Sequence, residues 1–228
     1  MDDGNLCIRA AKLLWEEFAL PGGLFISLNK RIPVAAGMAG GSTDAAAVLY
    51  AVNRMYHLGL SRKDLMKRGV KIGADVPYCV MRGTALAEGI GEELSPLPPM
   101  VRCPVLVAKP PISVSTKMVY QQLDAQTNIV HPDIDLLLRD LEKGDLPSIA
   151  AHMGNVLEAV TIPKYLVIEE IKDVMKQHGA LNAMMSGSGP TVFGLFEDQG
   201  TMKKAKAALS RTGLAAQIYG TTIYNNRR

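Results

Sequence analysis

The apolar positions in the first quarter of the chain predict two helices separated by a strand. Apolar residues recur with helical spacing over 6–18, and Asn5 stands where it can cap that helix. Apolar and polar residues alternate over 24–30, as they do in a strand with one buried face. A second helix is predicted over 42–56, where apolar residues return to one stripe. Its buried positions are expected at Ala45, Val48, Leu49, Val52 and Met55.

Capping and proline residues set the next boundaries. Ser61 and Asp64 have the spacing of a capping box, which predicts a helix over 62–71. The residue before Pro77 is expected to be extended, because a proline disfavours the helical region for its predecessor. Asp75 is therefore expected in a loop. Strands are expected after it, near 78–81 and 83–88.

The proline-rich stretch 96–99 is the expected domain boundary, which gives domains over 1–99 and 100–228. The second domain mixes helices with strands that are expected to pair in an antiparallel sheet. Its strands are predicted over 103–109, 180–186, 190–196 and 214–223, and its helices over 115–123, 133–142, 145–157, 163–178 and 199–211. The pattern as a whole predicts an α+β protein of two domains.

Composition narrows the class of protein. The 228 residues are 48% hydrophobic and 21% charged, which is typical of globular proteins. A net charge of +3, without a basic cluster, favours no nucleic-acid partner. No apolar run reaches the ~20 residues of a membrane span. The three cysteines and four histidines are scattered, so we expect free thiols in a reducing cytoplasm and no zinc site.

The stretch 33–47 carries the clearest candidate chemistry. Gly37, Gly40 and Gly41 let the backbone approach a ligand closely, and the helix expected from Ser42 presents unpaired N–H groups and a positive dipole end. Such a helix start binds anions, most naturally the phosphates of a nucleotide. It is not a P-loop, because Gly41 stands where that motif has lysine. A tight turn before a capped helix is the alternative.

Two segments together resemble the GHMP kinases, the family of galactokinase, homoserine kinase and mevalonate kinase. The stretch 33–47 is similar to the phosphate-binding motif of the family, and 185–191 is similar to its C-terminal glycine motif. The resemblance implies a two-domain fold. Its N-terminal part would be ribosomal protein S5 domain 2-like, here incomplete, and its C-terminal domain ferredoxin-like.

A closer likeness, to one branch of this family, lies in 30–46, 73–78 and 83–92. It implies ATP-dependent phosphorylation of the tertiary 2-hydroxyl of a cytidine diphosphate-linked methylerythritol, in non-mevalonate isoprenoid synthesis. The implied partner is this small molecule alone, without nucleic acid or membrane, and the implied protein is a bacterial cytoplasmic monomer or homodimer. Homoserine- or mevalonate-type kinases, and a non-catalytic nucleotide-binding relative, are the alternatives.

The same resemblance assigns residues to ATP and to the transfer step. Asp75 matches the catalytic aspartate of the family and Ser42 is a candidate ligand of Mg²⁺. Asp44 is interpreted as a capping or supporting residue, with an indirect metal contact as the alternative. The residues implied in ATP binding are Lys30, Pro33, Gly37, Ala39, Gly40, Gly41, Ser42 and Thr43.

Residues implied in substrate binding come mainly from the second domain. Tyr120 is expected to stack on the cytosine ring, although a lone tyrosine on a short helix is often a core residue. The glycine motif is expected to help shape the site, with a simple hairpin turn as the alternative. The set consists of Asp75, Thr116, Tyr120, Ser186, Gly187, Ser188 and Gly189.

One feature of the family has no counterpart here. Its members carry a catalytic lysine on a strand that precedes the segment matched by this sequence. That lysine would stand beside Asp75 as a cationic partner. If the chain is complete as it stands, we therefore expect weak kinase activity, because electrostatic and acid–base contributions are typically worth ~10²–10⁴ each.

Overall fold

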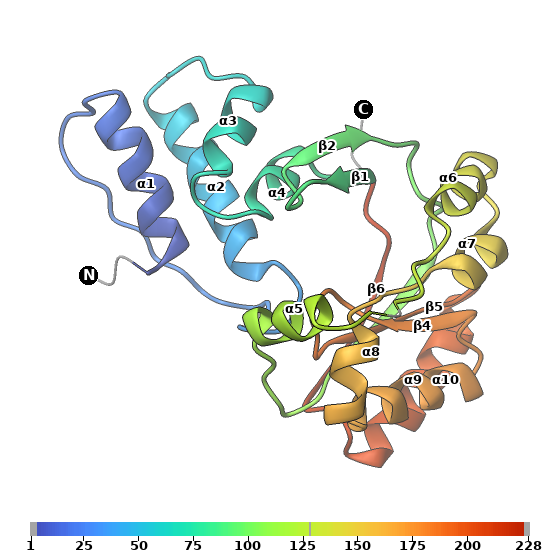
Figure 1. Cartoon of the computed structure of the whole chain (residues 1–228). Helices are drawn as coiled ribbons and strands as arrows, with labels where there is room; N and C mark the ends of the chain where they lie inside the picture. Colours follow the sequence, from blue (N-terminus) through green and yellow to red (C-terminus); the bar gives the residue numbers. More distant parts are fainter. Residues whose placement is uncertain (1–3, 128, 226–228) are drawn as a thin grey trace. The chain divides into compact units, whose positions relative to one another are not determined.

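The structure is a computed structural model that describes residues 4–127 and 129–225 (Figure 1). The described residues fall into two compact units. Unit 1 contains residues 4–34 and 39–97, and unit 2 contains residues 35–38, 98–127 and 129–225. The short segment 35–38 therefore packs with unit 2, although the residues on both sides of it belong to unit 1.

Unit 1 is built on packed helices. The helices are α1 (Leu6–Glu17), α2 (Gly40–Met55), α3 (Arg62–Gly69) and α4 (Val76–Met81), followed by the antiparallel hairpin of β1 (Ala85–Glu88) and β2 (Glu93–Pro96). Helix α2 packs against α1 on one side and α4 on the other. Leu14, Leu49 and Val52 lie fully buried between these helices and form the centre of the unit.

The helical predictions for this unit are confirmed. The Asn5 side chain caps α1 by accepting a hydrogen bond from the Cys7 N–H, 2.9 Å away. Ser61 and Asp64 form the predicted capping box at the start of α3. Met55 is the exception in the predicted stripe, because 60% of it is exposed at the last residue of α2.

The predicted strand over 24–30 is wrong. Within the described residues this segment pairs with no strand, and Phe25 is 92% exposed. Alternating apolar residues supply one face of a strand but not the hydrogen bonds of a neighbour, which a strand also needs.

The strand expected near 78–81 is also wrong, because those residues belong to helix α4. Val76, expected to be extended, is the first residue of this helix, and Pro77 lies in its first turn. Proline suits that turn, since the N–H that it lacks would have no partner inside the helix. The strand predicted over 83–88 is confirmed as β1.

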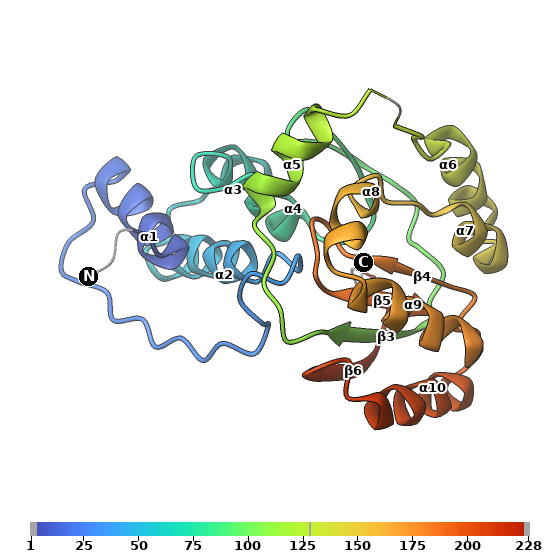
Figure 2. The same ribbon diagram turned by 60° about the horizontal axis from the view of Figure 1, so that its bottom comes forward.

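Unit 2 has a split β-α-β-β-α-β arrangement (Figures 1 and 2). The four strands β3 (Pro104–Lys109), β4 (Asn182–Met185), β5 (Val192–Leu195) and β6 (Gln217–Thr222) form a sheet in the order β4-β5-β3-β6. Every neighbouring pair is antiparallel, as predicted. The helices are α5 (Thr116–Asp124), α6 (Ile134–Lys143), α7 (Leu146–His152), α8 (Glu158–Thr161), α9 (Val167–Gln177) and α10 (Gln199–Thr212), with a 3₁₀ turn at Ile162–Lys164.

Helices cover both faces of this sheet. On one face, α9 lies against β4 and β5, and α10 lies against β3 and β6 (Figure 2). Leu106 points to that side and joins the larger core, whereas Val105 joins a second core with Ala150 of α7. The alternation along β3 therefore gives each face its own buried cluster.

Two predicted helices of unit 2 are shorter than expected. The helix over 145–157 ends at His152, and the helix over 163–178 begins only at Val167. The chain between them makes an irregular turn and the short α8. This break places the side chain of Asn155 against the turn that joins β4 to β5.

None of the helices in the described ranges combines the length and the apolar character that crossing a membrane requires.

The packing of α9 on the sheet predicts the stability of unit 2. Replacing the fully buried Ile171 by alanine is expected to lower the free energy of unfolding by about 2–5 kcal/mol, since it leaves a cavity. Val130→Ala is the control, because Val130 is 91% exposed and its loss is expected to change stability by less than about 0.5 kcal/mol. Urea unfolding measures both, and equal losses would contradict the described packing.

Candidate active site

The backbone before α2 has an unusual conformation. The φ angle is positive at alternate residues, with 51° at Ala35, 69° at Gly37 and 47° at Ala39. Alternating signs of φ turn successive N–H groups to the same side, which is how backbone segments bind anions. Alanine rarely adopts this region, so two such alanines mark strain of the kind found at binding sites.

The first turn of α2 in unit 1 has no side-chain cap, so its first N–H groups are unpaired within the described residues, as the sequence predicts. Its N-cap, Ala39, makes no side-chain hydrogen bond to the helix, so the first N–H groups lack the usual cap. A Cβ on Gly40 would lie 2.8 Å from the Cγ2 atom of Ile32, which requires glycine there. A Cβ on Gly41 would lie 3.4 Å from the Leu6 side chain. Tight packing and an uncapped start thus coincide at this turn.

Charged and hydroxyl side chains surround the same turn. Lys30 forms an ion pair with Asp44, both side chains being more than two-thirds buried. The ion pair agrees with the supporting role expected of Asp44 and not with the capping role, since the helix has no side-chain cap. The Thr43 hydroxyl donates to the Ala39 carbonyl oxygen at 3.0 Å, and Ser42 is buried.

Asp75 lies in unit 1 directly before α4, with its side chain exposed. In the described part of the chain its carboxylate makes no hydrogen bond or ion pair. Its backbone carbonyl accepts from the Cys79 N–H, and the Cys79 sulfur lies 3.5 Å from the Thr43 hydroxyl. Burial raises the pKa of Cys79, so this thiol stays protonated at neutral pH. The contact joins the helix that follows Asp75 to the first turn of α2.

In unit 2, the residues from 186 to 191 form the turn between β4 and β5, and we call Ser186–Gly189 the glycine turn. Gly37 lies against it. The Ser186 hydroxyl donates to the Gly37 carbonyl oxygen at 2.7 Å, and a Cβ on Gly37 would lie only 2.2 Å from the Ser186 carbonyl oxygen. The two glycine-rich motifs of the sequence therefore meet inside unit 2.

Helix α5 supplies a second neighbour of the glycine turn. The hydroxyls of Thr116 and Ser188 share a hydrogen bond of 2.8 Å, and Ser188 is buried. Tyr120, one turn further along α5, is 52% exposed. It is therefore not the core residue that a lone tyrosine on a short helix often is.

The structure thus groups the predicted site residues by unit. Unit 1 carries Lys30, Pro33, Ala39, Gly40, Gly41, Ser42, Thr43 and Asp75, and unit 2 carries Gly37, Thr116, Tyr120, Ser186, Gly187, Ser188 and Gly189. Unit 2 also has a cavity of about 440 Å³, lined by residues such as His131, His152 and Asn155. It is lined by none of the predicted residues.

Two polar residues near the glycine turn escaped sequence reasoning. Asn155 and Glu158 both bind the backbone at the end of β4. Asn155 falls within the helix predicted over 145–157 and Glu158 directly after it, so neither was singled out. The spacing Asn-x-x-Glu, typical of a helix start, is the signal that marks the break.

Metal binding by protein side chains alone has little support. In the ranges that the structure describes, no group of three or more histidine, cysteine, aspartate or glutamate side chains is arranged to hold an ion. Mg²⁺ in kinases is held largely by substrate phosphates and water, with one or two protein ligands. The buried Ser42 hydroxyl at the start of α2 is compatible with that limited role.

Unit 1 has an uncapped, glycine-rich helix start and, directly before α4, Asp75. Unit 2 of the same chain has the β-α-β-β-α-β arrangement. Together these features are those of an α+β phosphotransferase. Family models agree, since the GHMP kinases N terminal domain matches residues 5–83 and the GHMP kinases C terminal matches residues 137–215. The chain belongs to the GHMP kinase family.

Individual relatives are similar to this chain over nearly its whole length. The 4-diphosphocytidyl-2-C-methyl-D-erythritol kinase of Lachnospira eligens is 53% identical over 224 residues, which cover 98% of this chain and 78% of the relative. The protein of the same name from Geobacillus kaustophilus is 46% identical, with 99% and 77% covered.

Solved structures agree with these relatives. A crystal structure of 4-(cytidine 5'-diphospho)-2C-methyl-D-erythritol kinase has a TM-score of 0.81 and 32% identity, covering 97% of this chain and 79% of that one. Homoserine kinase from Cytophaga hutchinsonii has a TM-score of 0.78 but 21% identity, covering 96% and 75%, and shows the shared fold alone.

Because Gly37 packs against the glycine turn, adding one methyl group at this position is expected to lower the free energy of unfolding. Gly37→Ala is expected to destabilise by about 1–2 kcal/mol through its positive φ and by roughly 1–3 kcal/mol more through the clash with Ser186. Gly213→Ala is the matched control, because Gly213 has a φ of 72° and open space around it. Free energies of unfolding measured in urea separate the two effects. Equal losses in both variants would mean that the contact is absent.

Proposed function

We propose that this chain transfers the γ-phosphoryl group of ATP to the tertiary 2-hydroxyl of 4-diphosphocytidyl-2-C-methyl-D-erythritol. The support is the family membership, together with relatives of that name at 46–53% identity over nearly the whole chain. The reaction would supply a precursor of isoprenoids in the bacterial cytoplasm.

The observation that carries the proposal is the contact between Thr43 and Cys79 in unit 1. It holds the first turn of α2, an anion-binding feature, close to the helix that begins just after Asp75. Phosphoryl transfer needs charge neutralisation and a group that orients the attacking hydroxyl, and little other covalent chemistry from the protein. Unit 1 offers both.

Each residue of unit 1 then has a defined task. The backbone N–H groups of Gly40 and Gly41 donate to phosphate oxygens, and the Ser42 hydroxyl is available to Mg²⁺. Lys30 neutralises the charge of the Asp44 carboxylate, so that Asp44 does not repel the nucleotide. Asp75, exposed and without a partner in the described residues, accepts a hydrogen bond from the acceptor hydroxyl and takes its proton as the bond to phosphorus forms.

Unit 2 contributes recognition of the acceptor molecule. The exposed Tyr120 ring offers a stacking surface to a cytosine, an interaction worth ~1–3 kcal/mol per base. Thr116, one helical turn before Tyr120 on α5, shares a hydrogen bond with Ser188 of the glycine turn, which brings two hydroxyl groups together. A hydroxyl donates one hydrogen bond, so the bond between these two hydroxyls uses one of their two O–H donors.

A substrate panel tests the proposal. The protein is incubated with ATP, Mg²⁺ and one acceptor at a time: the cytidylyl compound, homoserine or mevalonate, with ADP release as the readout. We expect turnover of the cytidylyl compound only. Turnover of homoserine or mevalonate in its place would overturn the substrate assignment and leave the kinase class standing.

The assignment of Asp75 predicts a large loss of rate. Asp75→Asn is expected to lower kcat by about 10²–10⁴ and to leave the KM for ATP within a fewfold of its original value, since the amide accepts no proton. Asp135→Asn is the control, because Asp135 is an exposed carboxylate on α6. Steady-state kinetics of both variants give the answer. A kcat of Asp75→Asn equal to that of the control would remove Asp75 from the mechanism.

The ion pair between Lys30 and Asp44 predicts non-additive effects. Lys30→Ala leaves an unpaired carboxylate beside the phosphates and is expected to raise the KM for ATP by roughly tenfold, a coupling typical of neighbouring charges. Asp44→Ala alone is expected to change it less. In the double variant the KM for ATP should fall below that of Lys30→Ala. Strictly additive effects across the cycle would show that Asp44 does not act on the nucleotide.

A further inference from the structure

We propose that Asn155 is a positioning residue of the kinase, which fixes the glycine turn through its side-chain amide. This inference rests on the proposed function, because it assigns the turn a part in substrate binding. The contacts that support it all lie within unit 2.

The glycine turn has few restraints of its own. Gly187 and Gly189 both have positive φ, at 55° and 85°, and glycine loses more backbone freedom on ordering than other residues. Two backbone hydrogen bonds lie within the turn and the strand ends, from Ser186 N–H to the Thr191 carbonyl at 2.8 Å and from Gly189 N–H to the Ser186 carbonyl at 3.0 Å. A defined position therefore depends on side chains that come from outside.

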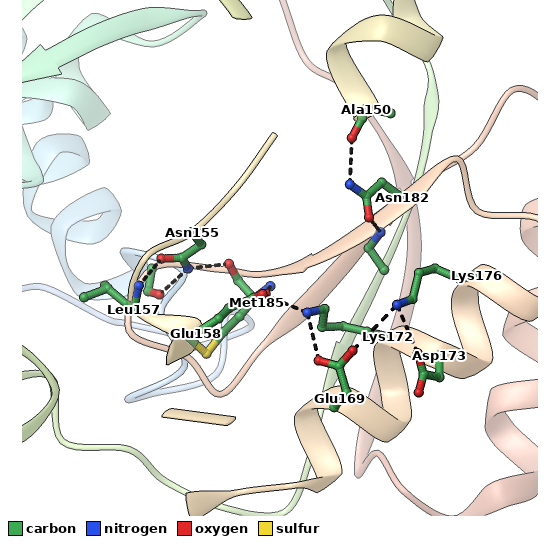
Figure 3. A network of polar contacts seen from close by, with 12 residues as sticks. Ala150, Asn155, Leu157, Glu158, Glu169, Lys172, Asp173, Lys176, Asn182 and Met185 are labelled. Atoms are coloured by element: carbon green, nitrogen blue, oxygen red, sulfur yellow. Dashed lines mark hydrogen bonds and ion pairs between the residues drawn. The ribbon is translucent and has the colours of Figure 1, made fainter. Parts of the chain in front are cut away.

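Asn155 supplies the main external contact (Figure 3). Its amide nitrogen donates to the carbonyl oxygens of Met185 and Gly187, both 2.8 Å away, and its amide oxygen accepts from the Leu157 N–H at 3.0 Å. One amide proton thus binds the end of β4 and the other binds the turn, and the amide oxygen anchors the side chain to its own segment. The orientation of the amide follows from these partners, since two carbonyl oxygens can face only a donor.

A second side chain holds the same point of the strand. Glu158 accepts from the Met185 N–H at 2.6 Å through one carboxylate oxygen and from the Lys172 ammonium at 2.7 Å through the other. Both backbone polar groups of Met185 are therefore bound by side chains at the open edge of β4.

Lys172 keeps this second contact charged. It is 8% exposed and also donates to Glu169 at 2.9 Å (Figure 3). Burial alone would lower the pKa of Lys172, but its hydrogen bonds to Glu158 and Glu169 raise it above the ordinary value. The ion pair with Glu158 is thus maintained at neutral pH, and the end of β4 keeps a fixed base from which the turn starts.

The turn that Asn155 holds carries the hydroxyl groups of Ser186 and Ser188, both of which belong to the candidate substrate site. Ser186 binds the Gly37 carbonyl, and Ser188 binds the Thr116 hydroxyl. A shift of the turn would move both hydroxyls together. Misplacement by about 1 Å can cost as much as 10²-fold in rate, even when the altered residue lies away from the reacting atoms.

The chain provides a matched control at the same strand. Asn182, three residues before Met185 on β4, donates from its side-chain amide to the Ala150 carbonyl at 2.7 Å. It is the same residue type at the same sheet edge and binds the neighbouring segment, but it does not contact the turn (Figure 3). A purely structural role for Asn155 predicts equal behaviour of the two positions.

The experiment compares alanine and aspartate substitutions at both positions. Asn155→Ala and Asn155→Asp are expected to lower kcat/KM for the cytidylyl acceptor by about 10- to 100-fold. The KM for ATP should stay within a fewfold. Asn155→Asp keeps the shape but replaces the donor by an acceptor, so it should be at least as impaired as Asn155→Ala. Asn182→Ala and Asn182→Asp should lower the thermal midpoint without changing either kinetic constant.

Amide hydrogen exchange gives a readout that does not depend on the reaction. In Asn155→Ala the hydrogen-bonded amides of Ser186 and Gly189 are expected to exchange at least about tenfold faster, because the turn opens locally. Asn182→Ala should leave them unchanged. Should Asn155→Ala fail to fold, Asn155→Asp gives the same comparison, since it keeps the shape of the side chain and removes only the donor.

The outcomes separate this inference from the proposed function. If the unaltered protein does not phosphorylate the cytidylyl compound, the proposed function fails, and faster exchange in the turn still supports the positioning role. If the unaltered protein is active and Asn155→Ala retains its kinetic constants and exchange rates, Asn155 has only a structural role and the inference is overturned.

Discussion

The hydrogen bond from Ser186 to the Gly37 carbonyl is the contact on which the rest of unit 2's candidate site depends. It joins two segments that are 149 residues apart in sequence, at a place where a single Cβ would lie 2.2 Å from a carbonyl oxygen. Glycine is required here for two reasons at once, since the φ angle is positive and no space exists for a side chain. The glycine motifs thus serve packing as well as ligand binding.

Polar side chains rather than apolar packing set the position of the glycine turn. Asn155, Glu158 and Lys172 lie around the end of β4, where a sheet edge leaves backbone groups without ladder partners. Fully satisfied polar networks of this kind are rigid, because each broken contact leaves a costly unpaired group. In unit 1 the ion pair of Lys30 with Asp44 has a comparable effect, since the lysine offsets the negative charge of a carboxylate next to a helix start suited to anions.

The sequence predicted the elements that have strong local signals. Helices α1, α2 and α3 followed from apolar periodicity and capping residues, and the antiparallel sheet of unit 2 followed from its strand patterns. Residues 24–30 show the limit of this reasoning, because alternation describes a possible face of a strand and says nothing about a partner. At α4, the general effect of Pro77 on its predecessor was outweighed by the suitability of proline for a first helical turn.

The residues of the candidate site, like the elements of the fold, could be predicted from the sequence only where they carry a local signal. The glycine-rich stretches and Asp75 could be named from the sequence because motifs and a family resemblance mark them. The pairing of Lys30 with Asp44 and the role of Asn155 could not, since both arise from tertiary contacts between residues without periodic spacing. Asp44 was therefore interpreted only as a capping or supporting residue, without a named partner.

The path of the chain at residues 35–38 has a consequence for how this protein can be divided. These four residues pack with unit 2 while their neighbours on both sides belong to unit 1. Cutting the polypeptide near Leu97 would therefore yield a C-terminal piece that lacks the carbonyl to which Ser186 donates. The C-terminal half is not a self-contained module in the genetic sense, and an exchange of halves between related enzymes would have to carry this tetrapeptide along.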